Sequence, residues 1–367
     1  MEQTMPEVTK EQIQAAIKEY VEPDLERDLV SANCVKDIAI DGDTAKVKVE
    51  LGYPAAGSAE RLAAAVKERV LGVPGIAKAD VEISCQVQAH SVQKALKPID
   101  NVKNIIAVAS GKGGVGKSTT AVNLALALAA EGATVGLLDA DIYGPSQPRM
   151  LGVSGQPESK DGSSLEPMQS HGLQVMSIGL LIDEETPMIW RGPMVTQALE
   201  QLLNDTNWSE LDYLVIDLPP GTGDTQLTLA QKVPVSGAVI VTTPQDIALL
   251  DARKGLKMFQ KVEVPVLGIV ENMSIHICSK CGHEEHIFGE GGGERMAKQY
   301  GVRLLGSLPL NAHIREETDN GNPTVAAQPE SRVTEIYREI ARRTAAKLSL
   351  QAKDYAARFP RIVIQND

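Results

Sequence analysis

Two different hydrophobic patterns divide this chain of 367 residues. In the first part, apolar residues recur at helical spacing in some segments and alternate with polar residues in others, which predicts amphipathic helices and strands with one wet face. In the second part, short continuous apolar runs alternate with longer helical segments. Such runs are typical of parallel strands that are covered on both faces. The patterns therefore predict a small α+β domain followed by a larger α/β domain.

Residues 1–90 carry the elements of a compact α+β domain. Thr9 and Gln12 form a capping-box signature, and the apolar residues that follow recur at helical spacing. An Asp41-Gly42 turn joins two alternating runs, which predicts a hairpin. The elements expected after the first helix are strands at residues 36–40 and 45–51, a helix at residues 58–71 and a strand at residues 76–87.

A polar linker at residues 91–103 separates this domain from residues 104–350, where strands and helices alternate. This alternation predicts a doubly wound, mostly parallel sheet, and ligands bind such sheets at the carboxyl ends of the strands. The tail at residues 351–367 carries no recognisable pattern. The strands of the larger domain are expected at residues 104–109, 134–139, 173–178, 213–217, 237–242, 265–271 and 303–308.

The composition narrows the classes of function. The net charge of −12 argues against a protein that coats nucleic acid, which needs a basic surface. The chain starts with acidic and polar residues rather than with a signal peptide, and no apolar run has the length of a membrane span. Four cysteines in a chain of this length are typical of reduced thiols. We therefore expect a cytoplasmic protein that binds neither nucleic acid nor membrane.

The strand at residues 104–109 runs into a glycine-rich loop and then into an Ala- and Leu-rich helix. The loop fits G-x-x-x-x-G-K-[ST], the P-loop pattern of NTPases. Because glycine has no Cβ, backbone N–H groups can converge on phosphate oxygens, together with the helix N-terminus. Lys117 is expected to reach the β- and γ-phosphates, and Ser118 to hold Mg²⁺. The residues expected around the nucleotide are Gly111, Lys112, Gly113, Gly114, Val115, Gly116, Lys117, Ser118 and Thr119.

Two other strands end in acidic residues. Asp139 and Asp141 follow the strand at residues 134–139, where a carboxylate can orient the attacking water or support the metal. Asp217 ends another buried strand in the Walker B arrangement and is expected to bind Mg²⁺ through water. Gly221 can donate its N–H to the γ-phosphate. The sequence therefore predicts an Mg²⁺-dependent ATPase.

A C-x₂-C pair, Cys278 and Cys281, lies between His276 and two further histidines, His283 and His286. Two thiolates on one turn can chelate a soft metal. The other two cysteines lie in the small domain, so that a four-thiolate site would require two subunits. A zinc site built from the two cysteines and a histidine of one chain is the alternative. The sequence predicts a metal here and leaves its identity open.

An extra lysine, Lys112, gives the loop the pattern K-G-G-x-G-K-[ST], which resembles the deviant Walker A ATPases of the MinD/ParA class. In that class this lysine reaches the partner's nucleotide, which implies a homodimer around two ATP molecules, with Lys112 offsetting charge on the transferring phosphoryl group. The resemblance further implies that Asp141 positions the attacking water and that Asp139 helps the metal shell. It also implies that Asn272 contacts the adenine and that the loop around Pro309 lines the same pocket.

The chain resembles the Mrp/ApbC-type iron–sulfur cluster carriers in three features. These are the sequence motif Asp-Leu-Pro-Pro-Gly-Thr-Gly-Asp at residues 217–224, the C-x₂-C pair and the small first domain. This resemblance implies one [4Fe–4S] cluster held by Cys278 and Cys281 of two subunits. It implies a cluster assembly scaffold as donor and apo iron–sulfur proteins as acceptors. The family often has a Gly-Cys-Pro turn where this chain has Gly52-Tyr53-Pro54, so we expect the small domain to serve docking rather than cluster handling.

Two other classes share parts of these motifs. A MinD/ParA-like positioning or regulatory ATPase has the same P-loop and Lys112, and in such a protein the C-x₂-C pair would hold a structural zinc. An electron donor resembling the nitrogenase iron protein also has a bridging cluster, but its cluster cysteines lie far apart in the chain.

Overall fold

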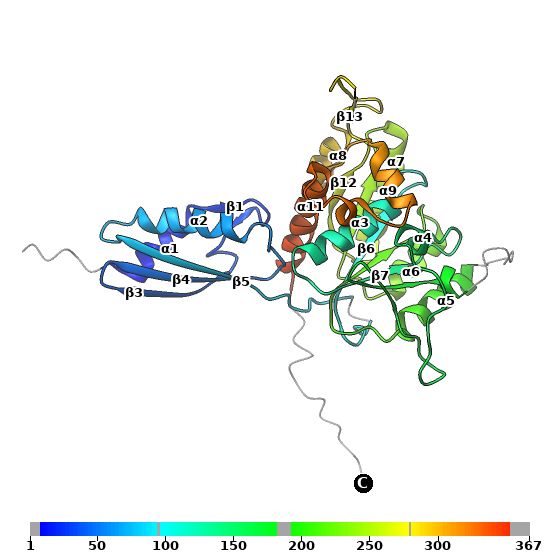
Figure 1. Ribbon diagram of the computed structural model, residues 1–367, viewed down its shortest axis with the longest axis horizontal. Helices are drawn as coiled ribbons and strands as arrows, with labels where there is room; N and C mark the ends of the chain where they lie inside the picture. Colours follow the sequence, from blue (N-terminus) through cyan, green and yellow to red (C-terminus); the bar gives the residue numbers. More distant parts are fainter. Residues whose placement is uncertain (1–7, 94–95, 182–191, 279, 353–367) are drawn as a thin grey trace, which may run out of the picture.

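The computed structural model describes residues 8–93, 96–181, 192–278 and 280–352. Two units lie side by side, with the smaller N-terminal unit at the left of Figure 1 and helix α11 (Arg332–Ser349) between the two. Of the predicted segments, most of the tail at residues 351–367 and the first seven residues lie outside the described part of the chain.

The small unit packs two helices on one face of a three-stranded sheet of order β3-β4-β5. The predicted capping box is present, because Thr9 and Gln12 exchange side-chain to backbone hydrogen bonds. Ile13, Ile17 and Val66 are buried against the sheet. The elements are α1 (Lys10–Lys18), β1 (Val21–Glu22), β2 (Arg27–Asp28), β3 (Val35–Asp41), β4 (Thr44–Leu51), α2 (Ala59–Leu71) and β5 (Lys78–Cys85).

The large unit contains an eight-stranded sheet of order β15-β12-β11-β6-β10-β7-β9-β8, in which only the edge strand β8 is antiparallel. The predicted fold class is confirmed. The strands are β6 (Val102–Ser110), β7 (Val135–Asp139), β8 (Met168–Ser170), β9 (Leu173–Ser177), β10 (Leu211–Asp217), β11 (Gly237–Thr242), β12 (Val266–Glu271) and β15 (Leu304–Ser307). Beside it, β13 (His276–Ile277) and β14 (Glu284–Glu285) form a separate hairpin.

Helices cover both faces of this sheet. They are α3 (Lys117–Ala130), α4 (Gln147–Met150), α5 (Gly192–Asn204), α6 (Asp224–Lys232), α7 (Asp246–Lys261), α8 (Gly292–Tyr300), α9 (Ala312–Asp319), α10 (Thr324–Ala327) and α11, with a 3₁₀ turn η1 (Ile178–Leu180). Alternate residues of β6 face different layers: Ile106 and Val108 join the core under α3 and α11, whereas Ile105 and Ala107 join the core under α5 to α7. The continuous apolar runs are therefore strands buried on both sides.

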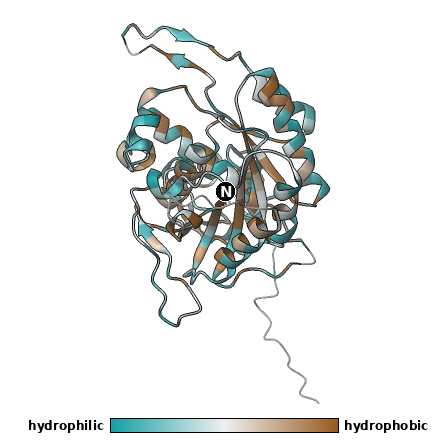
Figure 2. Ribbon diagram, turned by 90° about the vertical axis from the view of Figure 1, so that its right-hand side faces the viewer, coloured by the Kyte–Doolittle hydropathy of each residue, from teal (hydrophilic) through white to brown (hydrophobic). Residues whose placement is uncertain are grey.

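Strand β6 begins at Val102, inside the segment predicted as a linker, because Val102 pairs in parallel register with Leu211 of β10. The core of the small unit is continuous with the core under α3 and α11. The central strands in Figure 2 are mostly brown to white, whereas the hairpin of β13 and β14 at the top is mostly teal. Within the described residues, no helix has the length and apolar character to cross a membrane.

Candidate functional site

The predicted motif residues meet at the carboxyl edge of the large sheet. The P-loop follows β6, the acidic pair follows β7, Asp217 ends β10 and Asn272 follows β12. Strands β7, β10, β6, β11 and β12 are parallel neighbours in this order. Their carboxyl ends therefore share one edge, and the chain order changes direction around β6, which is where ligands bind in such sheets.

The P-loop needs glycine at two positions because other segments approach it closely. A Cβ on Gly111 would lie 2.1 Å from the backbone carbonyl carbon of Asp251 in α7. A Cβ on Gly116, whose φ is +82°, would lie 2.1 Å from Nδ2 of Asn272. By contrast, no atom lies within 4 Å of a Cβ built on Gly113. The loop is thus packed on its protein side and open elsewhere, and α3 starts directly after it.

Lys117 brings three of the predicted motifs together. Its side chain is buried, and the Nζ atom forms a short ion pair with the Asp217 carboxylate. The same Nζ lies 3.1 Å from the Ser118 hydroxyl and 3.7 Å from Asp141 Oδ2. Residues that are up to a hundred positions apart in the chain therefore surround one ammonium group.

Asp139 is fully buried and organises the loop that follows β7. Burial, together with the neighbouring Asp217 carboxylate, raises the pKa of Asp139 to about 7. Its oxygens accept hydrogen bonds from the N–H groups of Asp141, Ser146 and Gln147 at 2.9–3.1 Å and from the Ser177 hydroxyl at 3.2 Å. Because its oxygens accept these four bonds, Asp139 holds this loop next to the metal position rather than pointing freely at a ligand.

Asp141 stands closer to the opening of the site. Burial raises the pKa of its carboxyl group, the Lys117 ammonium opposes this shift, and Asp217 adds to it. Asp141 and Asp217 therefore share one lysine, and the Asp139 carboxyl group lies next to Asp217. A hydroxyl and carboxylate oxygens are the ligands that Mg²⁺ prefers, and the excess of negative charge suits a divalent cation.

Gly221 and Lys112 lie on the two sides of the loop. The Gly221 N–H donates to the carbonyl oxygen of Ser110 at 2.9 Å, so that this bond must be exchanged before Gly221 can donate to a phosphate. The Lys112 side chain is half-buried, and within the described part of the chain no carboxylate lies at ion-pair distance from its ammonium. Lys112 is therefore not part of the carboxylate cluster around Lys117.

Asn272 follows β12 and lies beside the P-loop, whereas Pro309 follows β15. The Asn272 Nδ2 donates to the carbonyl oxygen of Val115 at 2.9 Å, and its Oδ1 accepts the N–H of Met273. Pro309 follows Leu308, whose backbone bonds to Glu271. Asn272 thus braces the phosphate loop, and its contact with adenine stays a prediction.

The C-x₂-C pair lies on the hairpin of β13 and β14, which projects at the top of Figure 1. The Cys278 N–H donates to the carbonyl oxygen of His283 at 2.9 Å and closes the turn. Backbone N–H groups of Lys280 and Cys281 lower the pKa of the Cys278 thiol, and Cys281 also hydrogen-bonds to it. A lowered thiol pKa favours the thiolate, the form that binds metals.

Two of the flanking histidines anchor this hairpin to the sheet. His286 Nδ1 lies 2.8 Å from the Ser274 carbonyl oxygen, and His276 Nδ1 lies 3.2 Å from that of Leu310. In the residues that the structure describes, no three side chains of His, Cys, Asp or Glu are grouped so that they could hold a metal ion. The hairpin of one chain therefore brings two adjacent thiols to a site.

Exposed apolar side chains surround the hairpin and the start of α7. Ile277 and Ile287 on the hairpin and Ile247 and Leu250 on α7 are 49–65% exposed. The start of α8, which follows the hairpin in the chain, packs on α7, because a Cβ on Gly292 would lie 2.6 Å from Leu249 Cδ1. Exposed apolar clusters of this kind mark surfaces that bind another protein.

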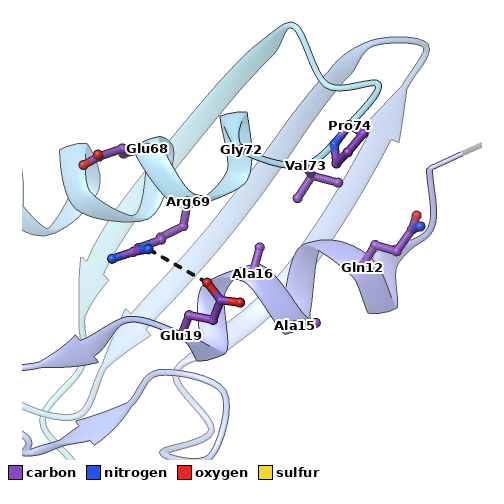
Figure 3. Close-up of a pocket in the computed structure, with 9 residues that line it drawn as sticks. All are labelled: Gln12, Ala15, Ala16, Glu19, Glu68, Arg69, Gly72, Val73 and Pro74. Atoms are coloured by element: carbon purple, nitrogen blue, oxygen red, sulfur yellow. Dashed lines mark ion pairs between the residues drawn. The ribbon is translucent and has the colours of Figure 1, made fainter.

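A groove of about 430 Å³ lies in the small unit between α1 and α2 (Figure 3). Its lining includes Ala16 and Val73, and Glu19 and Arg69 form an ion pair of 3.9 Å across it. Its lining includes none of the residues predicted to bind nucleotide or metal, so we assign it no chemistry.

Sequence reasoning missed Gln147. This glutamine is fully buried, and its side-chain amide donates to Asp217 and to the Ser118 carbonyl oxygen. The signal in the sequence that could have found it was its position in the segment that follows the acidic pair. The structure brings Lys117, Ser118, Asp141 and Asp217 together at one point and places Cys278 and Cys281 on a separate hairpin.

Comparison with known families gives a separate match for each of the two units. A family model described as NUBPL iron-transfer P-loop NTPase matches residues 101–345, and one described as iron-sulfur cluster assembly protein matches residues 10–83. The iron-sulfur cluster carrier protein of Escherichia coli (strain K12) is 52% identical over 349 residues, which cover 95% of each chain. That of Pseudomonas fragi is 62% identical over 274 residues, which cover 74% of this chain and 96% of the relative.

Solved structures match the large unit. A nucleotide-binding protein from Archaeoglobus fulgidus in complex with ADP has a TM-score of 0.56 at 38% identity and covers 63% of this chain and 90% of its own. The cell division ATPase MinD of Pyrococcus furiosus, with a TM-score of 0.50 at 23% identity, covers 65% of this chain and 97% of its own and shares the fold. Because the P-loop family model spans most of the sequence and the relatives match over nearly its whole length, this chain belongs to the family of NUBPL iron-transfer P-loop NTPases.

Proposed function

We propose that this protein is an ATP-hydrolysing carrier of iron–sulfur clusters. It would act as a homodimer that binds one [4Fe–4S] cluster through Cys278 and Cys281 of each subunit, receive it from an assembly scaffold and pass it to apo-proteins. The observation that carries the proposal is the pair of adjacent thiols, one with a lowered pKa, on a hairpin anchored next to a P-loop site. The carrier names of the relatives support it.

At the nucleotide site, Lys117 exchanges its carboxylate partners for the β- and γ-phosphate oxygens when ATP binds. Ser118 and Asp217 would then hold Mg²⁺, which neutralises charge on the phosphates. Asp141, freed from the ammonium, orients the attacking water toward the γ-phosphate. The glycines of the loop let backbone N–H groups donate to the same phosphates.

A dimer supplies what one chain lacks. Two thiols per chain are half of the four that hold a [4Fe–4S] cluster. The exposed side chains of Ile247, Leu250, Ile277 and Ile287 lie on α7 and on the segment of the hairpin, which suits a surface that a second copy covers. Lys112 would reach the nucleotide of the partner subunit across that surface.

Helix α7 contacts both the P-loop and the helix that follows the hairpin, which allows ATP to influence the cargo. The backbone of Asp251 in α7 lies against Gly111, and Leu249 of the same helix lies against Gly292 at the start of α8. A change in how two subunits meet over bound ATP would therefore change the exposure of the cluster.

The test is the content of iron, acid-labile sulfide and zinc per chain in protein reconstituted without oxygen. We expect about two irons and two sulfides per chain, the content of one four-iron cluster per dimer. Cys278→Ser should lose the iron and keep its nucleotide affinity. The control Cys85→Ser, which changes an exposed cysteine of the small unit, should keep both. One zinc per chain and no cluster would instead favour a positioning or regulatory ATPase with a structural zinc.

A further inference from the structure

Gln147 joins three segments of the nucleotide site although it belongs to none of the recognised motifs. Its Nε2 atom lies 2.9 Å from Asp217 Oδ2 and 3.1 Å from the carbonyl oxygen of Ser118. Its backbone N–H donates to Asp139 Oδ2 at 3.0 Å. The residue is fully buried at the start of α4. One side chain therefore links the loop after β7 to the first turn of α3 and to the end of β10.

These contacts fix the orientation of the amide group. Both neighbours of Nε2 are oxygen acceptors, and a carboxamide nitrogen has two hydrogens to donate. A flipped amide would place its own oxygen against the Asp217 carboxylate and the Ser118 carbonyl, with no hydrogen between them. The nitrogen is therefore saturated, and the amide oxygen is left to accept a hydrogen bond from another donor.

That oxygen, Gln147 Oε1, is buried and has no hydrogen-bond partner among the described residues, and the same holds for the hydroxyl of the preceding Ser146. A buried polar atom without a hydrogen-bond partner destabilises the folded state, and native proteins rarely contain one. Two such atoms in consecutive residues, beside Asp139 and Asp217, indicate a ligand that donates hydrogen bonds and carries positive charge. Water molecules bound to a divalent cation have both properties.

We propose that Gln147 is a positioning residue for the metal–nucleotide complex. Its Nε2 holds Asp217 Oδ2, so the carboxylate stays in place when Lys117 leaves it for the phosphates. Its Oε1, with the Ser146 hydroxyl, accepts hydrogen bonds from the water shell of Mg²⁺. The inference rests on the proposed nucleotide function and adds the residues that hold the outer shell of the metal.

The experiment measures Mn²⁺ binding to the protein–ADP complex by electron paramagnetic resonance, and ADP binding in EDTA by calorimetry. Gln147→Leu keeps a similar side-chain volume but removes both contacts. We expect it to weaken Mn²⁺ binding by about 10- to 100-fold, the usual loss when an outer-shell partner of a metal is removed. Its ADP affinity in EDTA should stay within about twofold of the wild type.

The matched control is Gln174→Leu, which removes a glutamine that bonds to the backbone of Ser209 outside the nucleotide site and should leave Mn²⁺ binding unchanged. Ser146→Ala removes only the unpaired hydroxyl. It can be tested by the same Mn²⁺-binding measurement if Gln147→Leu does not fold. It should weaken Mn²⁺ binding by a smaller factor. Wild-type Mn²⁺ affinity in both variants, or an equal loss of ADP affinity in EDTA, would overturn the proposal. Absence of ADP binding by the wild type would instead refute the nucleotide function.

Discussion

Helix α3 connects two clusters of buried charge with different compositions. At its N-terminal end, Asp141 and Asp217 share the Lys117 ammonium, and the Asp139 carboxyl group lies next to Asp217. At its C-terminal end, Glu131 caps the helix and forms ion pairs with two arginines of α11. It also accepts a hydrogen bond from the small unit. Both clusters are shielded from water, so each carries a desolvation cost that only close partners can offset.

The cluster at the C-terminal end joins the two units of the chain. Arg342, which is 2% exposed, contacts Glu131 Oε1 at 2.7 Å and Asp24 Oδ2 at 3.2 Å. Arg338 contacts the same Glu131 oxygen, and the Gly57 N–H donates to the other at 2.7 Å. Burial alone would lower the pKa of Arg342, but hydrogen bonds to Glu335 and Glu131 raise it above its ordinary value. Arg342 therefore stays charged and fastens the small unit to the ends of α3 and α11.

The difference between the clusters lies in their balance. At the junction, the buried acids Asp24 and Glu131 each pair with two arginines, as in a structural ion-pair network. At the nucleotide end, two carboxylates pair with one lysine, a third carboxyl group, that of Asp139, lies next to Asp217, and two neighbouring polar atoms have no partner in the described residues. A buried cluster with an excess of negative charge needs a cation from outside the chain. This excess distinguishes a cation-binding site from a structural ion-pair network.

The largest effect is expected from Lys117→Ala. This change removes the single cation of the nucleotide end and its contact with the phosphates, so ATP hydrolysis should fall by about 10²- to 10³-fold or more. The measurement is phosphate release under saturating Mg–ATP, with Lys254→Ala on the exposed side of α7 as the control. Normal turnover by Lys117→Ala would contradict the catalytic assignment.

Arg342→Leu tests the other end of the helix. It leaves Asp24 and Glu131 buried with fewer partners, so the free energy of unfolding should fall by about 3–5 kcal/mol. Arg315→Ala, which removes an exposed ion pair with Asp319, should cost at most about 1 kcal/mol. Urea denaturation measures both. If the free energy of unfolding falls no more in Arg342→Leu than in Arg315→Ala, the junction does not stabilise the fold as proposed.

A bound nucleotide should stabilise the protein through the cluster around Lys117 and not through the cluster around Arg342. Mg–ADP at about 100 times its dissociation constant should raise the free energy of unfolding by about 2.7 kcal/mol. The increment should be the same in the wild type and in Arg342→Leu, because the junction does not contact the ligand. It should disappear in Lys117→Ala. Thermal unfolding with and without the ligand gives all three values, and a smaller increment in Arg342→Leu would show that the ends are coupled.

The smallest effect concerns Glu22, next to the junction. Burial and the charge of Asp24 raise its pKa above 4.5, while the N–H of Leu25 opposes the shift. The folded state therefore keeps this proton at a pH where the unfolded state has lost it, and the free energy of unfolding falls as the pH rises through that window. Glu22→Gln should be at least as stable as the wild type at about pH 8, with the difference vanishing toward pH 4. A variant that is less stable at about pH 8 would show that the charge is needed.

Local patterns predicted much of this molecule. The continuous apolar runs became parallel strands, and the capping box at Thr9 started α1 as expected. The P-loop was recognisable because its glycines and Lys117 lie within one short segment of the chain. The antiparallel strand β8 was missed, because its three residues carry no periodic signal.

The sequence therefore predicts most of the elements and the local motifs, because periodicity, capping and loop chemistry act between neighbours. Which distant groups share a buried space depends on how the whole chain packs. Gln147 looks like an ordinary loop residue until β10 brings Asp217 to its amide. Arg342 looks like a charge on an amphipathic helix until the small unit brings Asp24 to it. Burial gives such groups their energetic weight, and burial is a property of the packed chain.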